Sequence, residues 1–500
     1  MSDPSCYRLP LERYPGMNPF VLDWLAGDER FLARKGNGKP SAAGAPRPAA
    51  LAGALIAANR SYGNDVEAEV RRWAAGGTFT IIAGQQTGFA GGPLYTLVKL
   101  ASLLKLKREH EPATVFFWMA TEDHDFDEAA SIALPRPDAE HQRDLTRLRA
   151  SHPADLRRVV GRMPVPEALI EQFLTALSID RPRWLRRGIT FCESFAELLA
   201  TVAPGRVILL DALLPELRRA GAPLFQSIAA KWDALQHALR DRSAELERAG
   251  YTPQIVPRED DGYTLLYAID GAGNREMLRD AAALPEPESI STSALTRPLL
   301  QDFVLRPDIF VGGPSEVAYY AQIVPLHEML SVPMPKVALR GHVLVAPRRV
   351  VRYFSRFDIQ PEKIFATPER VAAAHAAEEV VEVRAIADQA QRELVAHIDQ
   401  IRELALPADH AVARAIHKSI GHIEYHFHKL TERAIRGLVR KDRERFRAAR
   451  ELVAAFFPDQ QMQDRVVAWF PWWLESGNLL LDRIVDAVEP DTASFKIVSL

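Results

Sequence analysis

Two short apolar runs, each followed directly by a dense polar motif, dominate the pattern between Thr78 and Glu128. The run TFTIIAG leads into GQQTGFAGGPLYT, and the run TVFFWMA leads into TEDHDFDE. Between them, leucines recur at helical spacing at Leu97, Leu100 and Leu104. The order strand, Gly-rich turn, helix, strand and polar loop predicts a βαβ unit. Its polar motifs then lie at the carboxyl ends of parallel strands, where such sheets bind small molecules.

The same alternation continues further along the chain. GRVILLDA at 205–212 predicts another buried strand, and the sequence at 224–250 predicts a long amphipathic helix. DIFVGGPSEVAYY predicts a strand at 309–311, a turn, and a helix that opens at Ser315 with this serine as its cap. PKVALRGHVLVAP predicts a strand that carries Arg340. Strand-like segments alternating with helices favour an α/β fold with a Rossmann-like parallel-sheet core.

The periodicity then changes to that of long helices. Apolar residues three and four apart run from 383 to 405 and again from 412 to 438, which predicts a C-terminal antiparallel helical coiled-coil arm. Its surplus apolar surface favours dimerisation; the alternative is a hairpin that uses all its apolar residues in its own packing. The expected parts are an N-terminal arm and linker (1–60), a Rossmann-like core (61–365) with inserted connecting subdomains near 135–200 and 250–290, a coiled-coil hairpin (366–457), and a C-terminal tail packed on the core (458–500).

Composition and charge narrow the class of protein. A net charge of −3 argues against bulk binding of nucleic acid or an anionic membrane, which needs a basic excess. No run of roughly 18 apolar residues and no basic, apolar leader occurs, so we expect a cytoplasmic protein. Cys6 and Cys192 are the only cysteines of the sequence, which excludes a disulfide framework and a cysteine-rich zinc site.

The Gly-rich motif after the first strand is a candidate ligand-binding turn. Its glycines permit close approach of the backbone to a ligand, while its Gln and Thr side chains offer uncharged hydrogen bonds. Neither a dinucleotide fingerprint nor a P-loop is present. Lys99, in the following helix, is expected at the surface, and Tyr95 would suit the core equally well. The candidate ligand-binding residues are Gly84, Gln85, Gln86, Thr87, Gly88, Gly92 and Tyr95.

The acidic motif after the second strand is the stronger candidate for chemistry. Several carboxylates around one histidine are costly unless they bind a cation, hold a substrate amine, or orient His124 as an acid or base. We take His124, Asp123 and Asp125 as catalytic candidates and Glu122 as a binding candidate. Alternatively, Asp123 or Asp125 caps the next helix. Two carboxylates could also hold Mg²⁺, but their spacing assigns no metal site.

Beyond these local patterns, the chain resembles a known family. The motifs AGQQTGFAGGPLYT, FWMATEDHDFDE and TRPLLQDFVLRPDIFVGGPSEVAYYAQ, followed by the helical hairpin, resemble the bacillithiol biosynthesis cysteine-adding enzyme family over most of the chain. The resemblance implies a Rossmann-like core related to class I nucleotidyl transferases and aminoacyl-tRNA synthetases. It also implies two connecting insertions and a coiled-coil homodimer. The implied activity is a ligase that joins cysteine to glucosaminyl malate in the last step of bacillithiol biosynthesis.

The resemblance also places further residues in the same pocket. Among them, Arg297 suits a carboxylate or phosphate, because its planar fork donates two parallel hydrogen bonds. The full set of these candidates is Arg297, Gln301, Asp302, Gly312, Gly313, Glu316, Tyr319 and, on the next strand, Arg340. The synthetase motifs HIGH and KMSKS are missing, and the tail WFPWWLESGNLLLDRIVDAVEP differs from what the family leads us to expect.

Forming an amide from a carboxylate needs a leaving group, so ATP is the expected cosubstrate. Two other classes of function stay open at this point. One is a metal-dependent nucleotidyl transferase or hydrolase built on the acidic motif. The other is a non-catalytic nucleotide-binding scaffold whose coiled coil recruits partners.

Overall fold

The computed structural model describes residues 7–34, 47–135, 145–151, 157–255, 263–373, 378–405, 410–439 and 443–500. These residues form two compact units. One unit contains Arg8–Leu344 together with Gln463–Val498, and the other is built mainly of Val345–Met462. The domain boundaries at 365 and 458 that the sequence suggests stay a prediction.

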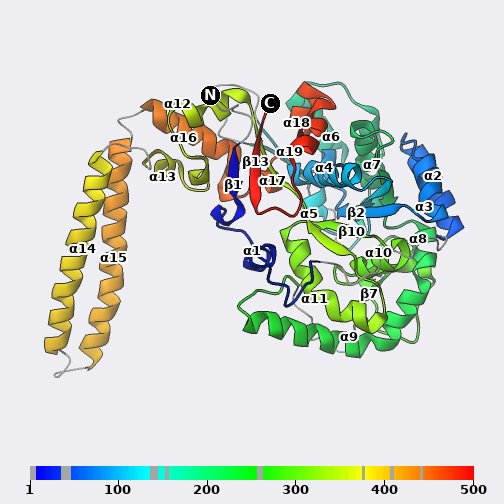
Figure 1. The fold of residues 1–500 in the computed structure, drawn as a ribbon, viewed down its shortest axis with the longest axis horizontal. Coiled ribbons are helices and arrows are strands. Elements are labelled where there is room, and N and C mark those ends of the chain that lie inside the picture. The colour runs from blue at the N-terminus through cyan, green and yellow to red at the C-terminus, as the bar shows by residue number, and fades with distance from the viewer. Residues whose placement is uncertain are drawn as a thin grey trace. The chain divides into compact units, whose positions relative to one another are not determined.

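The first unit is built around a five-stranded parallel sheet with the order β11-β10-β2-β3-β6, of which β2 and β10 are labelled in Figure 1. All seven positions of β3 are buried, as expected for a central parallel strand covered on both faces. Helix α4 (Leu94–Glu109) connects β2 to β3, which confirms the predicted βαβ unit and the Rossmann-like α/β class. The strands are β2 (Phe79–Gln85), β3 (Ala113–Met119), β6 (Ile208–Asp211), β10 (Ile309–Gly312) and β11 (Lys336–Leu339).

Two buried asparagines close the edge of this sheet at β6. Asn59, in α2 (Ala49–Ser61), accepts the N–H of Leu209 at 3.0 Å and donates to the carbonyl of the same residue at 2.8 Å. Asn64 donates to the carbonyl of Val207 at 2.9 Å. The asparagine side chains therefore replace a neighbouring strand and leave these edge groups satisfied.

A three-stranded antiparallel sheet with the order β8-β7-β9 forms one insertion. Its strands are β7 (Leu266–Ile269), β8 (Arg275–Met277) and β9 (Ile290–Thr292). It follows the long helix α9 (Ala222–Arg248), which begins and ends within two residues of the predicted helix. A hairpin of β4 (Ser131–Leu134) and β5 (Thr146–Arg149) belongs to the other insertion. The insertion sheet supplies side chains to the candidate site.

The prediction of a single strand that carries Arg340 is wrong, because two strands that belong to different sheets meet at this residue. Strand β11 ends at Leu339, and β12 (His342–Ala346) joins β13 (Ser494–Ser499) and β1 (Arg8–Pro10). The N–H of Arg340 makes a last hydrogen bond to the carbonyl of Gly312 at 2.8 Å. At Gly341 a Cβ would lie 2.8 Å from that of Val488, so only glycine fits where the chain leaves the parallel sheet.

The C-terminal segment of the first unit packs on the Gly-rich turn. Trp469 is fully buried, and its indole N–H donates to the carbonyl of Gly91 at 3.2 Å. A Cβ on Gly91 would lie 2.3 Å from this indole ring, and the φ of Gly91 is +84°. The N–H of Leu94, at the start of α4, donates to the carbonyl of Val467 at 2.8 Å. This segment, with α17 (Gln463–Val466), α18 (Phe470–Ser476) and α19 (Leu479–Ala487), thus fixes the turn.

The second unit contains the predicted helical hairpin. Helices α14 (Glu378–Ala405) and α15 (His410–Val439) lie side by side (Figure 1). Ile416, Ile420 and Ile423 are half-buried at the predicted spacing of three and four. Other large apolar side chains of the two helices are exposed, including three that the same spacing places in the seam (Leu394, Ile401 and Leu430): Val381, Ile386, Leu394, Ile401, Leu404, Tyr425 and Leu430.

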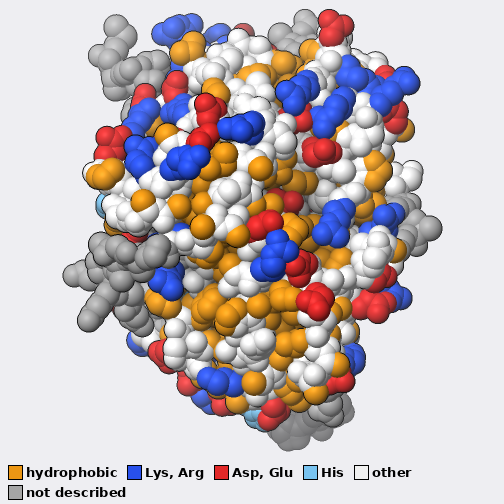
Figure 2. All heavy atoms as spheres, turned by 90° about the vertical axis from the view of Figure 1, so that its right-hand side faces the viewer, with side chains coloured by type: hydrophobic (Ala, Val, Ile, Leu, Met, Phe, Trp, Pro, Cys, Tyr) orange, Lys and Arg blue, Asp and Glu red, His pale blue; other side chains and the backbone are white. Residues whose placement is uncertain are grey.

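The face that carries α2 and α3 (Glu67–Ala75) mixes charges of both signs among exposed apolar side chains (Figure 2). Arg60 pairs with Glu67 at 2.8 Å, and Arg72 pairs with Glu69 at 2.9 Å, so this face is not a basic patch. A cavity of about 300 Å³ lies at the turn between the two helices, lined by Ile56, Arg60, Gly63, Asn64, Asp65, Val66 and Glu67. None of the helices in the described ranges is long and apolar enough to cross a membrane.

Replacing Trp469 tests whether the C-terminal segment fixes the Gly-rich turn. We expect Trp469→Ala to lower the free energy of unfolding by about 3–5 kcal/mol, because it removes a buried indole and its hydrogen bond. Urea unfolding followed by circular dichroism measures this loss. Trp473→Ala is the control, since Trp473 is only half-buried and bonds to the neighbouring Asn478. Equal losses in both variants would contradict the special role of Trp469.

Candidate active site at the carboxyl edge of the sheet

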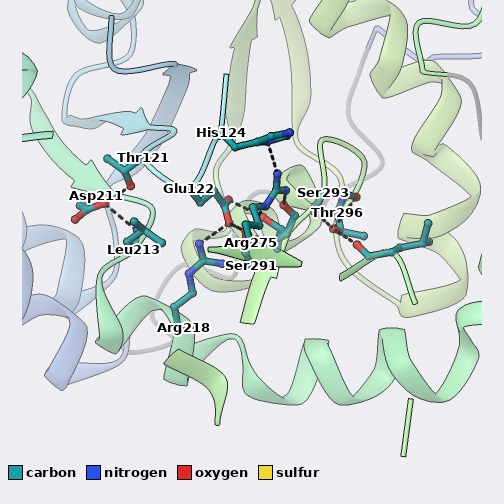
Figure 3. Close-up of polar contacts among 12 residues, drawn as sticks. Thr121, Glu122, His124, Asp211, Leu213, Arg218, Arg275, Ser291, Ser293 and Thr296 are labelled. Atoms are coloured by element: carbon teal, nitrogen blue, oxygen red, sulfur yellow. Dashed lines mark hydrogen bonds and ion pairs between the residues drawn. The ribbon is translucent and has the colours of Figure 1, made fainter. Parts of the chain in front are cut away.

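Glu122 lies at the centre of a buried polar network directly after β3 (Figure 3). Its carboxylate accepts hydrogen bonds from Arg218 at 2.6 Å, from the Ser291 hydroxyl at 2.7 Å, and from the N–H and hydroxyl of Thr292 at 3.0 and 2.7 Å. Only 4% of Glu122 is exposed. The sequence suggested Glu122 as a ligand-binding residue, but both of its oxygens bind protein groups, so it joins the core to the β7–β9 insertion instead.

The positive charge of Arg218 explains why Glu122 stays ionised. Burial by itself raises the pKa of Glu122, but the positive charge of Arg218 and the hydrogen bonds to the carboxylate outweigh this effect and lower it. Arg218 is fully buried. Removing either charge leaves the other uncompensated in the interior.

His124 lies two residues further along the same loop and is half-exposed. Its Nδ1 lies 3.0 Å from a guanidinium nitrogen of Arg275, which belongs to β8. Arg275 also donates to the Ser291 hydroxyl at 3.0 Å and to the carbonyl of Thr292 at 2.6 Å. No sequence pattern pointed to Arg275, because 151 residues separate it from His124 and it stands in no recognisable motif.

The two aspartates of the motif have different environments. Asp123 accepts hydrogen bonds from the Gln86 amide and, at 2.7 Å, from the N–H of His124. Burial opposes ionisation, but the interaction of its carboxylate with the His124 side chain, together with the hydrogen bonds from the Gln86 amide and the His124 N–H, lowers the pKa of Asp123 to about 2, so it is an anion at neutral pH. Asp125 is the N-cap of α5 (Phe126–Ala129) and accepts the N–H of Glu128 at 2.9 Å. Asp125 therefore has the capping role that the sequence offered as an alternative to catalysis.

The Gly-rich turn and the acidic motif are joined by hydrogen bonds. Besides the contact from Gln86 to Asp123, the amide of Gln85 donates to the Tyr95 hydroxyl at 3.2 Å. Tyr95 in turn donates to Glu128 at 3.1 Å. Burial raises the pKa of both Tyr95 and Glu128. The two motifs predicted to share one edge of the sheet are thus in direct contact.

The remaining residues of the turn shape its backbone. Thr87 is buried. At Gly88 a Cβ would lie 3.1 Å from the Cα of Gly92, whose φ is +67°. The turn therefore closes on itself, and side chains at these two glycines would open it.

Lys99 is buried rather than exposed, which corrects the expectation from the sequence. One turn after Tyr95 in α4, it faces the sheet and donates to the carbonyl of Gly84 at 2.8 Å and to Gln85 at 3.0 Å. It also pairs with Glu316. Burial lowers the pKa of Lys99, and the carboxylate of Glu316 opposes this shift. The helical spacing from Tyr95 is the signal that could have placed Lys99 at the site.

The helix after β10 starts differently from the prediction. Helix α11 (Pro314–Leu330) has Gly313 as its N-cap, and Ser315 lies inside it. Glu316 reaches back and accepts the N–H of Gly313 at 2.7 Å. The glutamate takes the capping role because its carboxylate at the third helical position reaches the free N–H groups. Gly312 ends β10, and a Cβ there would lie 2.9 Å from the Phe310 ring.

Arg297 is the described cation at this edge that suits an anionic ligand best. It begins α10 (Arg297–Leu305) and donates to the hydroxyl of Tyr319 at 2.7 Å and to the amide oxygen of Gln301 at 3.1 Å. Both hydrogen-bond partners are neutral, and the carboxylate of Glu316 acts on its charge without a hydrogen bond to it among the described contacts. A Cβ on Gly84 would lie 3.4 Å from a guanidinium nitrogen of Arg297, which places this group at the end of β2.

Two other predicted residues are occupied by protein partners. Arg340 pairs with Asp464 of the C-terminal segment at 2.6 Å, and both side chains are buried. Asp302 accepts from Gln301 at 2.9 Å and lies 2.9 Å from His327. Neither is a free contact for a substrate.

The acidic motif does not form a cage for a metal ion. In the part of the chain that the structure describes, no three His, Cys, Asp or Glu side chains are placed to hold a metal ion together. Asp123 and Asp125 each use oxygens in hydrogen bonds within the protein. Mg²⁺ at this edge would need oxygen ligands from a substrate.

Changing Glu122 tests the buried network. We expect Glu122→Gln to cost about 3–5 kcal/mol of unfolding free energy near neutral pH, because it leaves Arg218 buried without a counter-charge. Folding lowers the pKa of Glu122, so its stabilisation is complete above the usual value of 4.5 and is lost as the pH falls through the folded-state value.

Urea unfolding at neutral and acid pH measures both effects. The difference between wild type and Glu122→Gln should shrink in acid. The control is Glu276→Gln, which alters an exposed pair with Arg157 and should cost under about 1 kcal/mol. A loss for Glu122→Gln as small as that of the control would refute the central role of Glu122.

With this geometry in hand, comparison with known proteins is direct. Residues 30–341 match "Bacillithiol biosynthesis BshC, N-terminal Rossmann-like domain", and residues 343–500 match "Bacillithiol biosynthesis BshC, C-terminal coiled-coil domain". Proteins named "Putative cysteine ligase BshC" are similar along most of their length. The one from Solibacter usitatus is 28% identical over 480 residues, 89% of each chain, and the one from Koribacter versatilis is 29% identical over 445 residues, 82% of each chain. The chain therefore belongs to the BshC family of bacillithiol biosynthesis.

Proposed function

We propose that this protein is a cytoplasmic ligase that joins the carboxylate of cysteine to the amine of glucosaminyl malate, the last step of bacillithiol biosynthesis, with ATP as cosubstrate. Relatives that align over most of the chain carry the name of a cysteine ligase, which supports the reaction class. The observation that carries the proposal is the convergence of both polar motifs at the carboxyl edge of a parallel sheet. Parallel α/β sheets bind their ligands at this edge.

Formation of the amide bond requires that the cysteine carboxylate is activated before the amine attacks it. A carboxylate oxygen of cysteine attacks a phosphorus of ATP and expels pyrophosphate or ADP, giving an acyl adenylate or acyl phosphate. The glucosamine nitrogen then attacks the acyl carbon, the C–N bond forms, and the bond from acyl carbon to oxygen breaks to release AMP or phosphate. The amine loses one proton in this step. Holding the two reactants in place supplies much of the rate.

The residues at the edge suit separate parts of this reaction. Arg297, whose described partners are neutral, binds the carboxylate or a phosphate. The Gly-rich turn approaches the nucleotide with its backbone. Asp123, ionised at neutral pH, attracts the substrate amine. His124 is half-exposed beside Asp123 and offers a ring N–H to a reacting oxygen as an acid.

Replacing His124 tests the proposed chemistry. We expect His124→Ala to lower turnover by about 100-fold or more while leaving the fold intact, because a positioned acid or base contributes that much. Mass spectrometry of bacillithiol formed from cysteine, glucosaminyl malate and Mg-ATP measures turnover, and AMP or ADP identifies the activation step. The control His237→Ala removes an exposed histidine of α9 and should keep full activity.

The outcomes separate the proposed ligase from its alternatives. Unchanged activity in His124→Ala would exclude its catalytic role. Nucleotide binding by the wild type without any product would favour the scaffold. ATP hydrolysis that requires tightly bound metal and ignores cysteine would favour the metal-dependent class.

We also propose that the hairpin of α14 and α15 forms a homodimer. Ile401 and Leu404 on α14 are 57% and 82% exposed, and Leu430 on α15 is 63% exposed. Apolar side chains of this size are depleted from helix surfaces that face only water, whereas a second hairpin would bury them. The matched family description also names a coiled-coil domain.

Adding charge to the hairpin tests the dimer. We expect Leu404→Glu combined with Leu430→Glu to shift the protein from dimer to monomer, because buried carboxylates without partners oppose association. Analytical ultracentrifugation measures the mass. The control Lys418→Glu changes charge at an exposed polar position of α15 and should stay dimeric. A monomeric wild type, or a dimer that survives the double change, would contradict this interface.

A further inference from the structure

The contact between Arg275 and His124 restricts where the histidine carries its proton. A guanidinium group has only N–H donors and stays protonated in proteins. The 3.0 Å contact to Nδ1 of His124 is therefore a hydrogen bond only if Nδ1 is the acceptor. In a neutral imidazole the proton then lies on Nε2.

A second neighbour of Nδ1 offers the opposite arrangement. The carboxylate of Asp123 lies 3.5 Å from Nδ1 and would accept from a protonated ring. This contact is longer than the usual distance of an N–H···O hydrogen bond, whereas the 3.0 Å contact to Arg275 lies within it. The shorter contact to Arg275 therefore decides the state of the ring.

The position of Arg275 is itself fixed by the insertion sheet (Figure 3). Its guanidinium lies 3.8 Å from the centre of the Tyr267 ring in β7 and donates to Ser291 and Thr292 in β9. Ser291 and Thr292 also bind the carboxylate of Glu122. Ser291 and Thr292 thus hold Arg275 and also bind Glu122 on the loop that carries His124. Both side chains are therefore positioned by the same two residues, which fixes the distance between them.

We infer that Arg275 is a positioning residue that holds His124 in the Nε2–H tautomer, so that the ring presents a hydrogen-bond donor to an anionic substrate oxygen. With Nδ1 engaged by Arg275 and Nε2 carrying the proton, the ring has no free acceptor. His124 then assists the activation of the carboxylate as a donor to phosphate or carboxylate oxygen. The proton released by the amine goes to the departing phosphate group or to water. The identity of that oxygen rests on the proposed function, but the tautomer does not.

Nitrogen NMR of isotope-labelled histidine side chains tests the inference without any assay of activity. The resonances of His124 are assigned by their loss in His124→Gln. We expect the wild type to show a proton on Nε2 and an unprotonated Nδ1. Arg275→Met should lose this preference and give a mixture of tautomers, whereas Arg275→Lys keeps a cationic donor and should retain it. The control Arg157→Met, on an exposed arginine paired with Glu276, should leave the spectrum unchanged.

Two results would overturn the inference: a proton on Nδ1 in the wild type, or an unchanged tautomer in Arg275→Met. The first does not depend on Arg275→Met, so it remains decisive even if that variant fails to fold. In the ligase assay, Arg275→Met should lower kcat by about tenfold or more with a smaller change in KM, and Arg275→Lys should restore part of it. Wild-type protein with the expected tautomer but no ligase activity would refute the proposed function alone.

Discussion

The buried ion pair between Glu122 and Arg218 is the constraint on which the candidate site depends. Glu122 follows β3 directly, and its carboxylate binds Ser291 and Thr292 of the insertion as well as Arg218. A carboxylate this deeply buried stays ionised only because its partners compensate the loss of water. The same contacts orient the loop on which Asp123 and His124 project toward the sheet edge. A single glutamate thereby joins the strand, the insertion and the reactive loop.

Several charged side chains at this edge form ion pairs within the protein. These paired side chains are held in place, whereas a charged side chain outside such a pair can bind a ligand. Lys99 is paired with Glu316, and Arg340 is paired with Asp464 of the C-terminal segment. Arg297, in contrast, has neutral partners. Paired groups give the edge its shape, because buried charges hold their geometry only while the partner is present. An anionic substrate group would then form an ion pair with Arg297, beside the Gly-rich turn. The hydrogen bond from Trp469 to Gly91 holds this turn in place.

The parts of this structure that could be predicted from sequence are those encoded locally. Strands β2 and β3 are apolar because both faces of a parallel sheet are covered, and the polar motifs follow where the strands end. Asp125 also fits a local rule, since it caps the next turn of helix. Arg275 was missed because its role comes from contacts across the fold that no spacing encodes, whereas Lys99 lies one helical turn after Tyr95 and could have been placed at the site by that spacing. The change from one sheet to another at Arg340 could not be predicted either, because it depends on the close approach of Gly341 to Val488.

A crystal structure of the protein with cysteine and a non-hydrolysable ATP analogue tests the central claim most directly. We expect both ligands at the carboxyl edge, with the nucleotide against the Gly-rich turn and an anionic group within hydrogen-bond distance of Arg297 and His124. Ligands bound in the cavity between α2 and α3, with the carboxyl edge empty, would contradict the assignment of the site.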